Sequence, residues 1–401
     1  MVMPDIHFGT GKFEFGMSPR VVFGRGRRAE IGRIALDATQ QEAGRRAWLL
    51  TGASFAANDA APGIEDALEK SGFTLKAHCV SGEPLVSHVD HAVELAREFS
   101  PDVIIAVGGG SVLDTGKAVA GLLANGGSSV EYLEGPGTGK ELKLPSIPFI
   151  AMPTTAGTGS EVTKNAVITA DDRSFKKSMR SPHLFPRFAL VDSELTHSLP
   201  ERTTVFTAMD ALTQLIESYT SAGASVVTDS LALTGIRLVA RSLQRVMADG
   251  SDGEARDQMA LAALLSGICL ANAGLGAVHG LVAPLGARFP VPHGAGCAAL
   301  LAPVVEANTR CLQRGNANHP VLNKYRTVAD VLVQCAPGTG KEPHQVIRRL
   351  VADVRIPGLR NWGVTANAIE DVVRASRGSS MRFNPVVLED SELETALEAA
   401  L

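Results

Sequence analysis

Short apolar runs alternate with helix-like stretches through the first half of the chain. Runs that end in glycine or polar residues are Arg46–Thr51, Val103–Val107, Ile147–Met152 and Phe188–Val191. Uninterrupted runs of this length are typical of strands buried on both faces of a sheet. The stretches 60–70 and Val112–Leu123 between them have helical character. This alternation predicts an α/β domain with a parallel sheet and crossover helices.

The pattern changes near residue 201, where apolar residues begin to recur at i, i+3 and i+4 spacing. Strand-like runs are nearly absent beyond this point, so the second half is predicted to be all-α. We place the boundary at Leu199-Pro200, giving domains of residues 1–199 and 200–401. The predicted helices are Phe206–Tyr219, Asp229–Met247, Ala255–Ala273, Val321–Gln334, 342–353 and 366–377.

Composition narrows the range of partners and compartments. The 401 residues are 45% hydrophobic and 20% charged, which is ordinary for a globular chain of two or three domains. A net charge of −4 gives no electrostatic reason to expect nucleic acid or an anionic membrane as a partner. The five cysteines include no C-x-x-C pair, which favours a reducing, cytoplasmic setting. The first residues lack the apolar core of a signal peptide, and no run is long enough to span a membrane.

A glycine-rich turn, Gly108-Gly109-Gly110-Ser111, joins a predicted buried strand to a predicted helix. Glycine lets the backbone approach a ligand closely, and a helix N-terminus offers free N–H groups to a pyrophosphate. Ser111 is a candidate helix cap and Asp114 lies in the first turn. The pattern is not G-x-G-x-x-G, so a plain tight turn and a phosphate cradle are equally good interpretations.

A second polar cluster, Pro153–Glu161, follows another predicted strand. Its hydroxyls and glycines suit hydrogen bonding to a phosphate, a ribose or a carboxamide, although a solvated loop with a capping residue has the same composition. Both clusters follow strands of one parallel sheet, and the carboxyl edge of such a sheet is where α/β proteins bind ligands. Together the clusters favour nucleotide binding.

A third group of residues has the chemistry of a metal site. Asp210 and Gln214 are four apart and share one face of a predicted helix. His279 closes an apolar helical stretch, and His293 lies in a Pro/Gly turn 14 residues later. Imidazole nitrogens with a carboxylate suit Zn²⁺ or Fe²⁺. Spacing alone favours the structural alternative, in which both histidines are satisfied near a helix end and Asp210 is an N-cap.

Five ordered segments together resemble the iron-containing, or group III, alcohol dehydrogenases over essentially the whole chain. The resemblance implies a dehydroquinate synthase-like fold: an α/β dinucleotide-binding domain, an all-α domain, and an active site in the cleft between them. It also implies a homodimer or larger homo-oligomer. The segments are GGGSVLDTGKAVA (108–120), PTTAGTGSEVTKNAVI (153–168), MDALTQLIESY (209–219), GLGAVHGLVAPLGARFPVPHGAGCAAL (274–300) and NPVVL (384–388).

The resemblance implies a metal held by Asp210, His279 and His293, with Gln214 at the position of a further histidine. A Gln carbonyl oxygen is neutral and a weaker donor than imidazole. Ala283 stands where many members have a histidine thought to relay a proton. We expect a metal site in which Gln214 is an altered ligand or a group behind the ligands. The two departures also bring the chain closer to metal-independent relatives such as the maleylacetate reductases.

The resemblance also assigns the cofactor site. No carboxylate follows Thr51, where Gly52 stands, so a 2′-phosphate is not repelled and both NAD and NADP are expected cofactors. By this resemblance the pyrophosphate, nicotinamide, ribose and adenosine contacts fall on Gly109, Gly110, Ser111, Asp114, Thr154, Thr155, Thr158, Ser160, Lys176 and Leu195.

We therefore expect an NAD(P)-dependent oxidoreductase that transfers a hydride between nicotinamide and a small alcohol, aldehyde or ketone, assisted by Fe or Zn. One alternative is a metal-independent maleylacetate-type reductase in which Lys176, Lys177 or Arg288 orients a substrate carboxylate. Another is a catalytically silent paralogue that only binds nucleotide or a partner. The substrate pocket is expected to be lined by residues of the helical domain around 266–290, where small residues are frequent: Ser266, Gly267, Ala271, Ala273 and Gly274.

Overall fold

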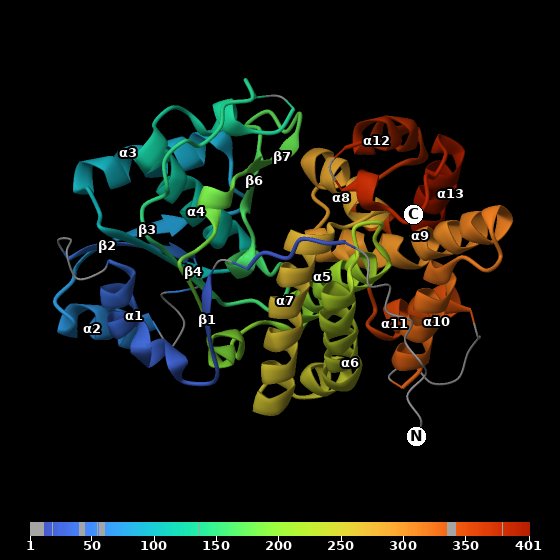
Figure 1. Ribbon diagram of the computed structural model, residues 1–401, viewed down its shortest axis with the longest axis horizontal. Coiled ribbons are helices and arrows are strands. Elements are labelled where there is room, and N and C mark those ends of the chain that lie inside the picture. Colours follow the sequence, from blue (N-terminus) through green and yellow to red (C-terminus); the bar gives the residue numbers. More distant parts are fainter. Residues whose placement is uncertain are drawn as a thin grey trace.

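The computed structural model describes residues 12–17, 19–39, 45–53, 55, 61–135, 137–334, 342–378 and 380–401. Residues 1–11, on which the prediction about a signal peptide rests, lie outside the described residues, as do Ala60 and Cys335. Figure 1 shows two halves side by side, an α/β half from the first part of the chain and a helical half from the second.

A six-stranded sheet forms the centre of the α/β half, and all of its pairings are parallel, as predicted. The four predicted strands are confirmed as β2, β4, β5 and β8, although β5 begins two residues after Ile147. Two edge strands, β1 and β3, were not predicted because their mixed apolar and charged residues carry no buried-strand pattern. In sheet order the strands are β1 (Arg20–Phe23), β8 (Phe188–Val191), β5 (Phe149–Pro153), β4 (Val103–Gly108), β2 (Arg46–Gly52) and β3 (Thr74–Val80).

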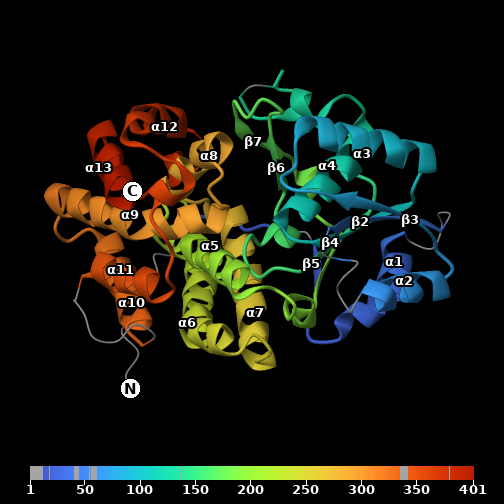
Figure 2. The same ribbon diagram turned by 180° about the vertical axis from the view of Figure 1, so that it is seen from behind.

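Helices cover both faces of this sheet (Figure 2). Alternate residues of β2 enter different cores: Ala47 and Leu49 pack with α1 and α2, whereas Trp48 and Leu50 pack with α3 and α4. Because helices cover both faces, the side chains on each face of a central strand are apolar. The strand therefore has an uninterrupted apolar sequence. The helices are α1 (Ile31–Ala38), α2 (Ala61–Lys70), α3 (Val86–Phe99) and α4 (Gly110–Asn125).

An antiparallel hairpin of β6 (Asn165–Thr169) and β7 (Lys176–Arg180) stands apart from the main sheet. It packs against α4 on one side, and β7 also contacts α8 of the helical half. The sequence KKSMR of β7 is mostly charged and polar, so periodicity did not predict this strand. The hairpin brings Lys176 and Lys177 to the boundary between the two halves.

The helical half is built around α5, which packs against α6, α7 and α9. No strand follows β8 in the described part of the chain, as predicted, and α5 begins at Glu201. The helices are α5 (Glu201–Thr220), α6 (Val226–Ala248), α7 (Gly253–Ala273), α8 (Ala277–Arg288), α9 (His293–Gly315), α10 (Pro320–Leu332), α11 (Pro343–Asp353), α12 (Ile369–Ser376) and α13 (Asp390–Ala400).

Three local predictions about helix ends were wrong. Gly274, with φ 72°, ends α7, so His279 lies in the first turn of a separate helix, α8, and does not close the preceding one. His293 is the first residue of α9 rather than part of a turn. Ser111 is the second residue of α4, and the N-cap position is held by Gly109. In each case a glycine or proline moved the boundary by one or more residues.

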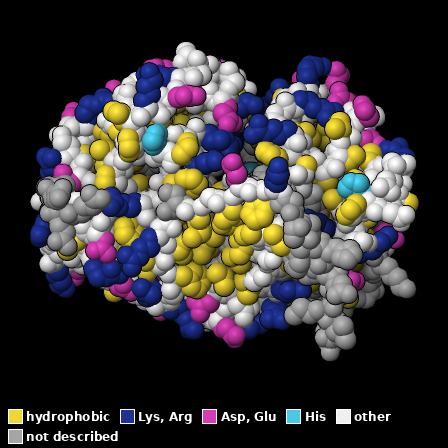
Figure 3. All heavy atoms as spheres, viewed as in Figure 1, with side chains coloured by type: hydrophobic (Ala, Val, Ile, Leu, Met, Phe, Trp, Pro, Cys, Tyr) yellow, Lys and Arg dark blue, Asp and Glu magenta, His cyan; other side chains and the backbone are white. Residues whose placement is uncertain are grey.

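An apolar patch lies over α7 and the edge strand β1 on the face shown in Figure 3. Its half-buried members are Val21, Phe23, Leu231 and Leu261. Among the described helices none is by itself long and apolar enough to cross a bilayer. Only α7 and α8 taken together reach that length and composition, and they are bent by 103° at their break.

Candidate metal centre and cofactor cleft

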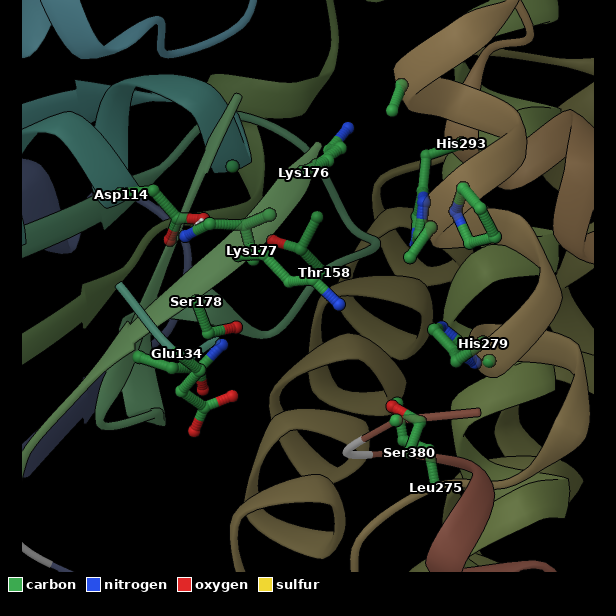
Figure 4. Close-up of a pocket in the computed structure, with 18 of the residues that line it drawn as sticks. Asp114, Glu134, Thr158, Lys176, Lys177, Ser178, Leu275, His279, His293 and Ser380 are labelled. Atoms are coloured by element: carbon green, nitrogen blue, oxygen red, sulfur yellow. Dashed lines mark hydrogen bonds between the residues drawn. The ribbon is translucent and has the colours of Figure 1, made fainter. Parts of the chain in front are cut away.

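A cavity of about 400 Å³ lies at the boundary between the two halves. Figure 4 shows the residues of the α/β half and its hairpin facing His279 and His293 across this space. The lining residues used below are Gly110, Ser111, Asp114, Thr158, Ser160, Lys176, Lys177, Asp210, Gln214, His279, Ala283, Arg288, His293, Gly378 and Arg382.

Three residues predicted as metal ligands meet on one wall of the cavity. The Nε2 atom of His279 lies 3.3 Å from Oδ1 of Asp210, and Nε2 of His293 lies 3.6 Å from the same oxygen. A fourth side chain, Cys297, joins them, and one donor atom from each of the four lies within 4.8 Å of every other. The sequence analysis missed Cys297, although its place four residues after His293 puts both on one face of α9.

Each of these side chains comes from a different turn of the helical half. Asp210 is buried in the middle of α5, so the alternative of an N-capping Asp is wrong. His293 begins α9, which starts directly against α5. A Cβ on the next residue, Gly294, would lie 1.9 Å from the backbone oxygen of Phe206. Glycine at this position therefore lets α9 approach α5 closely enough for His293 to reach Asp210.

Glu217 orients His279. Its Oε2 atom is 2.5 Å from Nδ1 of His279, and its Oε1 atom accepts the backbone N–H of Val278 at 2.7 Å. The first turn of α8 is also held by Asn384 of the NPVVL segment, which accepts the N–H of Ala277. A carboxylate hydrogen-bonded to Nδ1 fixes the ring so that Nε2 faces Asp210. Metal-binding histidines usually have such a carboxylate on their second ring nitrogen. Glu217 lies seven residues after Asp210 on the same face of α5, a spacing that could have signalled it.

The electrostatics of the cluster call for a positive charge at its centre. Burial lowers the pKa of His293 to about 4, so this ring is neutral at neutral pH and keeps a free electron pair. Although burial alone would raise the pKa of Asp210, the two histidines lower it, and the carboxyl is ionised. Burial likewise opposes the charge on His279, but Cys297, Glu217 and Asp210 raise its pKa well above the ordinary value. The cluster thus contains an ionised carboxylate (Asp210), a neutral imidazole (His293) and an imidazole that retains a proton (His279). This combination is suited to a divalent cation.

Gln214 touches the cluster through its amide nitrogen. The Nε2 atom donates to Oδ1 of Asp210 at 3.2 Å, and Oε1 accepts from the hydroxyl of Ser266 at 3.0 Å. The carbonyl oxygen, which is the only part of the amide able to bind a cation, is therefore turned toward α7 and away from the centre.

The glycine-rich turn lies at the point where the order of the sheet reverses. Strands β2 and β4 are neighbours, but the chain leaves β2 toward β3 and leaves β4 toward β5, on opposite sides. Ligands of open α/β sheets bind in the crevice at such a point. Gly110 begins α4 here, and a Cβ on it would lie 2.8 Å from the Thr158 side chain. The turn and the loop carrying Thr158 can pack together only because this residue is glycine.

The structure places the residues predicted for cofactor binding in two groups. Gly110, Ser111, Asp114, Thr158, Ser160 and Lys176 line the cavity. Gly109, Thr154 and Thr155 belong to the same strand-end loops but are not among the lining residues, and Leu195 is buried in the core beneath the sheet. Lys176 forms an ion pair with Glu83, with Nζ 2.8 Å from Oε1.

A buried lysine holds the two strand-end loops together. Lys117 is fully buried and donates to Thr163 Oγ1 at 3.0 Å and to the backbone oxygen of Asn165 at 2.6 Å. It also pairs with Asp114, which in turn accepts the hydroxyl of Ser160 at 2.5 Å. Asp114 and Ser160 therefore fix the shape of the cleft by binding one another. The sequence analysis missed Lys117, whose i, i+3 spacing from Asp114 was the available signal.

Comparison with known proteins follows the same division of the chain. The model of the iron-containing alcohol dehydrogenase family matches residues 18–193, and that of the Fe-containing alcohol dehydrogenase family C-terminal region matches 204–401. The chain is 34% identical over 346 residues to long-chain-alcohol dehydrogenase 1 of Geobacillus thermodenitrificans, covering 84% of this chain and 85% of that protein. It is 33% identical over 281 residues to NAD-dependent methanol dehydrogenase of Bacillus methanolicus, covering 70% and 72%.

Solved structures agree with these matches. A 1,3-propanediol oxidoreductase superposes with a TM-score of 0.87 at 29% identity, covering 98% of this chain and all of the other. Sulfoacetaldehyde reductase from Bifidobacterium kashiwanohense, solved with NAD⁺, gives a TM-score of 0.82 at 28% identity, covering 97% and 99%. With both halves matched in order, the chain belongs to the iron-containing alcohol dehydrogenase family and is an oxidoreductase of the alcohol dehydrogenase type.

Proposed function

We propose that this protein catalyses reversible, metal-assisted hydride transfer between NAD and a small alcohol or its carbonyl partner. The observation that carries the proposal is the position of Asp210, His279 and His293 on the cavity wall. His279 and His293 face Thr158 across the cavity in Figure 4, and Asp210 and Gly110 line the same cavity. A cation-binding cluster and a nucleotide-binding sheet edge face one cavity, which is the arrangement that aligns a substrate carbonyl with a nicotinamide.

The chain's own groups have distinct tasks in this scheme. Asp210, His279 and His293 hold the cation, and Glu217 keeps the Nε2 atom of His279 directed at it. A divalent cation bound there supplies Lewis-acid stabilisation of the alkoxide oxygen, while the nicotinamide supplies the hydride chemistry. The first turn of α4, beginning at Gly110, offers its N–H groups to the pyrophosphate.

NAD is the cofactor we propose, because a methanol dehydrogenase relative is named as NAD-dependent and a reductase relative is solved with NAD⁺. Gly52 ends β2 beside the glycine-rich turn and provides no carboxylate against a 2′-phosphate. Because nothing at this position would repel the 2′-phosphate of NADP, the assay described below compares both cofactors.

An acidic carbonyl substrate is the second candidate, favoured by the charges of the cavity. Lys177 reaches across the cavity, and its Nζ lies 3.9 Å from where a Cβ on Gly378 would be. Within the described ranges, Lys177 has no ion pair with a carboxylate, in contrast to Lys176. Arg288 and Arg382 also line the space. A carboxylate or sulfonate on the substrate would meet these cations, as the maleylacetate-type alternative requires.

Metal removal separates the candidates. The purified protein is stripped with a chelator, reloaded anaerobically with Fe²⁺ or with Zn²⁺, and assayed with NADH or NADPH against neutral and acidic aldehydes and ketones. We expect chelation to lower kcat/KM at least about 100-fold and reloading to restore it, because Lewis-acid catalysis supplies several kcal/mol. Full activity after chelation would identify a metal-independent reductase. NADH binding without turnover of any carbonyl would identify a silent paralogue.

We also propose that the protein is a homodimer, or a larger homo-oligomer, in a reducing compartment. The apolar patch over α7 includes Val21 and Phe23 of β1, an edge strand whose second side has no partner strand among the described residues. An edge strand beside apolar surface is suited to pairing with a second copy. Sedimentation equilibrium should give at least twice the 42.0 kDa chain mass, whereas a monomer across micromolar concentrations would contradict the proposal.

A further inference from the structure

We propose that Cys297 is the fourth protein ligand of the metal centre, in place of Gln214, and that its thiolate makes the site prefer Zn²⁺ to Fe²⁺. The inference rests on the proposed metal-assisted function. Its basis is that Cys297 is the fourth member of the only close group of His, Cys, Asp and Glu donor atoms found among the described residues.

The spacing of the donor atoms fits one ion. The Sγ atom of Cys297 lies 3.7 Å from Oδ1 of Asp210 and 3.8 Å from Nε2 of His279. The corresponding separations of Asp210 from the two histidines are 3.3 and 3.6 Å. Bond lengths of about 2.0–2.1 Å for nitrogen or oxygen and about 2.3 Å for sulfur put neighbouring donors of a tetrahedral ion roughly 3.3–3.6 Å apart. The four measured separations are within a few tenths of an ångström of this range, and the two remaining pairs, His293 with His279 and His293 with Cys297, lie within 4.8 Å.

Cys297 lies on the inner side of the cluster. It is fully buried, and it is absent from the cavity lining, which includes Asp210, His279 and His293. An ion among the four donors would therefore have the thiolate behind it and the cavity in front of it. A substrate oxygen that entered from the cavity would then be a fifth donor, and catalytic zinc sites can expand to five-coordination during reaction.

Gln214 is poorly placed for the same task. Its carbonyl oxygen already accepts from Ser266, and its NH₂ group donates to the Asp210 carboxylate. Turning the amide over would set the carbonyl oxygen against the Asp210 oxygen and would replace the hydrogen bond to this carboxylate by a repulsion between two acceptors. Gln214 thus acts as a positioning residue for Asp210, and the vacant fourth position falls to the nearest remaining donor, Cys297.

The thiolate also decides which metal is preferred. When the metal–sulfur bond forms, the S–H bond breaks and its proton is released to solvent, so that Asp210 and Cys297 together balance the two positive charges of the ion. Thiolate is a soft donor that selects Zn²⁺ among the metals bound by imidazole and carboxylate. A site with a sulfur ligand in place of a neutral amide is therefore more favourable for Zn²⁺ than for Fe²⁺.

Metal spectroscopy tests the assignment without reference to turnover. Zn²⁺-loaded protein is examined by X-ray absorption at the zinc edge, and Co²⁺-loaded protein by absorption in the near ultraviolet. We expect one sulfur neighbour at about 2.3 Å and a thiolate-to-cobalt charge-transfer band. Both signals should persist in Cys269→Ser, a buried cysteine of α7 outside the cluster, and both should vanish in Cys297→Ser and Cys297→Ala.

Affinity provides the second readout. Substitutions of residues that only orient a ligand typically weaken metal binding by roughly 10–100-fold, and Cys297→Ala should weaken Zn²⁺ binding by more than this. Cys297→Ser should shift the Zn²⁺/Fe²⁺ preference toward iron. Absence of a sulfur neighbour from the zinc spectrum of the wild-type protein would overturn the assignment. This measurement does not depend on the folding of any variant. Turnover by such sulfur-free, metal-loaded protein would leave the proposed function standing. Failure of the wild type to bind Zn²⁺, Co²⁺ or Fe²⁺ would overturn both.

Discussion

Replacing His279 with alanine is expected to lower kcat/KM for carbonyl reduction by at least about 10³-fold, because it would remove one of the proposed metal ligands and leave the Lewis acid unbound or displaced. A loss of roughly 4 kcal/mol of transition-state stabilisation corresponds to that factor. The variant also deprives Glu217 of its partner at 2.5 Å, leaving a buried carboxylate with only the Val278 N–H and weakening the site further. Steady-state kinetics with saturating NADH and a titrated aldehyde measures the effect.

Two controls isolate this effect from a general loss of structure. His91 is exposed on α3 and is not among the residues that line the cavity, so His91→Ala should keep wild-type kinetics. NADH binding to His279→Ala, followed by fluorescence, should stay within a few-fold of wild type because the glycine-rich turn belongs to the other half. Activity of His279→Ala equal to that of the wild type would remove the metal-assisted mechanism and leave the metal-independent reductase.

Gly267→Ala is expected to lower kcat by about 100-fold and to destabilise the protein by roughly 1–3 kcal/mol. A Cβ on Gly267 would lie 2.2 Å from the backbone oxygen of Gly159 and 2.8 Å from its Cα, so α7 or the loop must move. That loop carries Thr158 at the cofactor side, and the neighbouring Ser266 holds Gln214 at the metal side. One added methyl group therefore disturbs the alignment of the two sides of the cavity.

A matched Gly-to-Ala substitution elsewhere in the chain is expected to change the stability of the protein in the opposite direction. Gly63 lies in α2 and has nothing within 4 Å of an added Cβ, so Gly63→Ala should stabilise the protein by up to about 1 kcal/mol through helix propensity alone. Urea unfolding midpoints and kcat of both variants provide the comparison. If Gly267→Ala also gained stability and kept its kcat, the close backbone contact between the two halves would not control the cleft.

The arrangement of strands and helices was largely readable from local patterns. Val103–Gly108 is buried on both faces, and this is why its apolar run was unbroken. The prediction failed where the pattern was mixed, as in the hairpin strand Lys176–Arg180, or where one residue set a helix boundary, as Gly274 did after α7. Residues around 266–290 were predicted to line the pocket, and many of them do, but of the five small residues named there only Gly274 lines the cavity. Gly267 is small because Gly159 packs on it.

The candidate site was predicted in part. The resemblance supplied Asp210, His279 and His293, which the fold brings within reach of one ion. It could not show that Glu217 orients His279, because that contact joins residues 62 positions apart. Nor could it show that Gln214 presents its nitrogen rather than its oxygen, since the choice depends on the direction in which the Asp210 carboxylate, an acceptor, points.

The sequence by itself determined the parallel sheet, the helical second half and the glycine turn at the sheet edge. These follow from periodicity and residue chemistry, which act over a few neighbouring positions. Only the tertiary structure decided that Cys297 lies 3.7 Å from Asp210 across 87 positions of the chain, and that Lys177 faces the helical half. Such contacts depend on how helices pack, and packing is set by the sum of many weak interactions that no local pattern records.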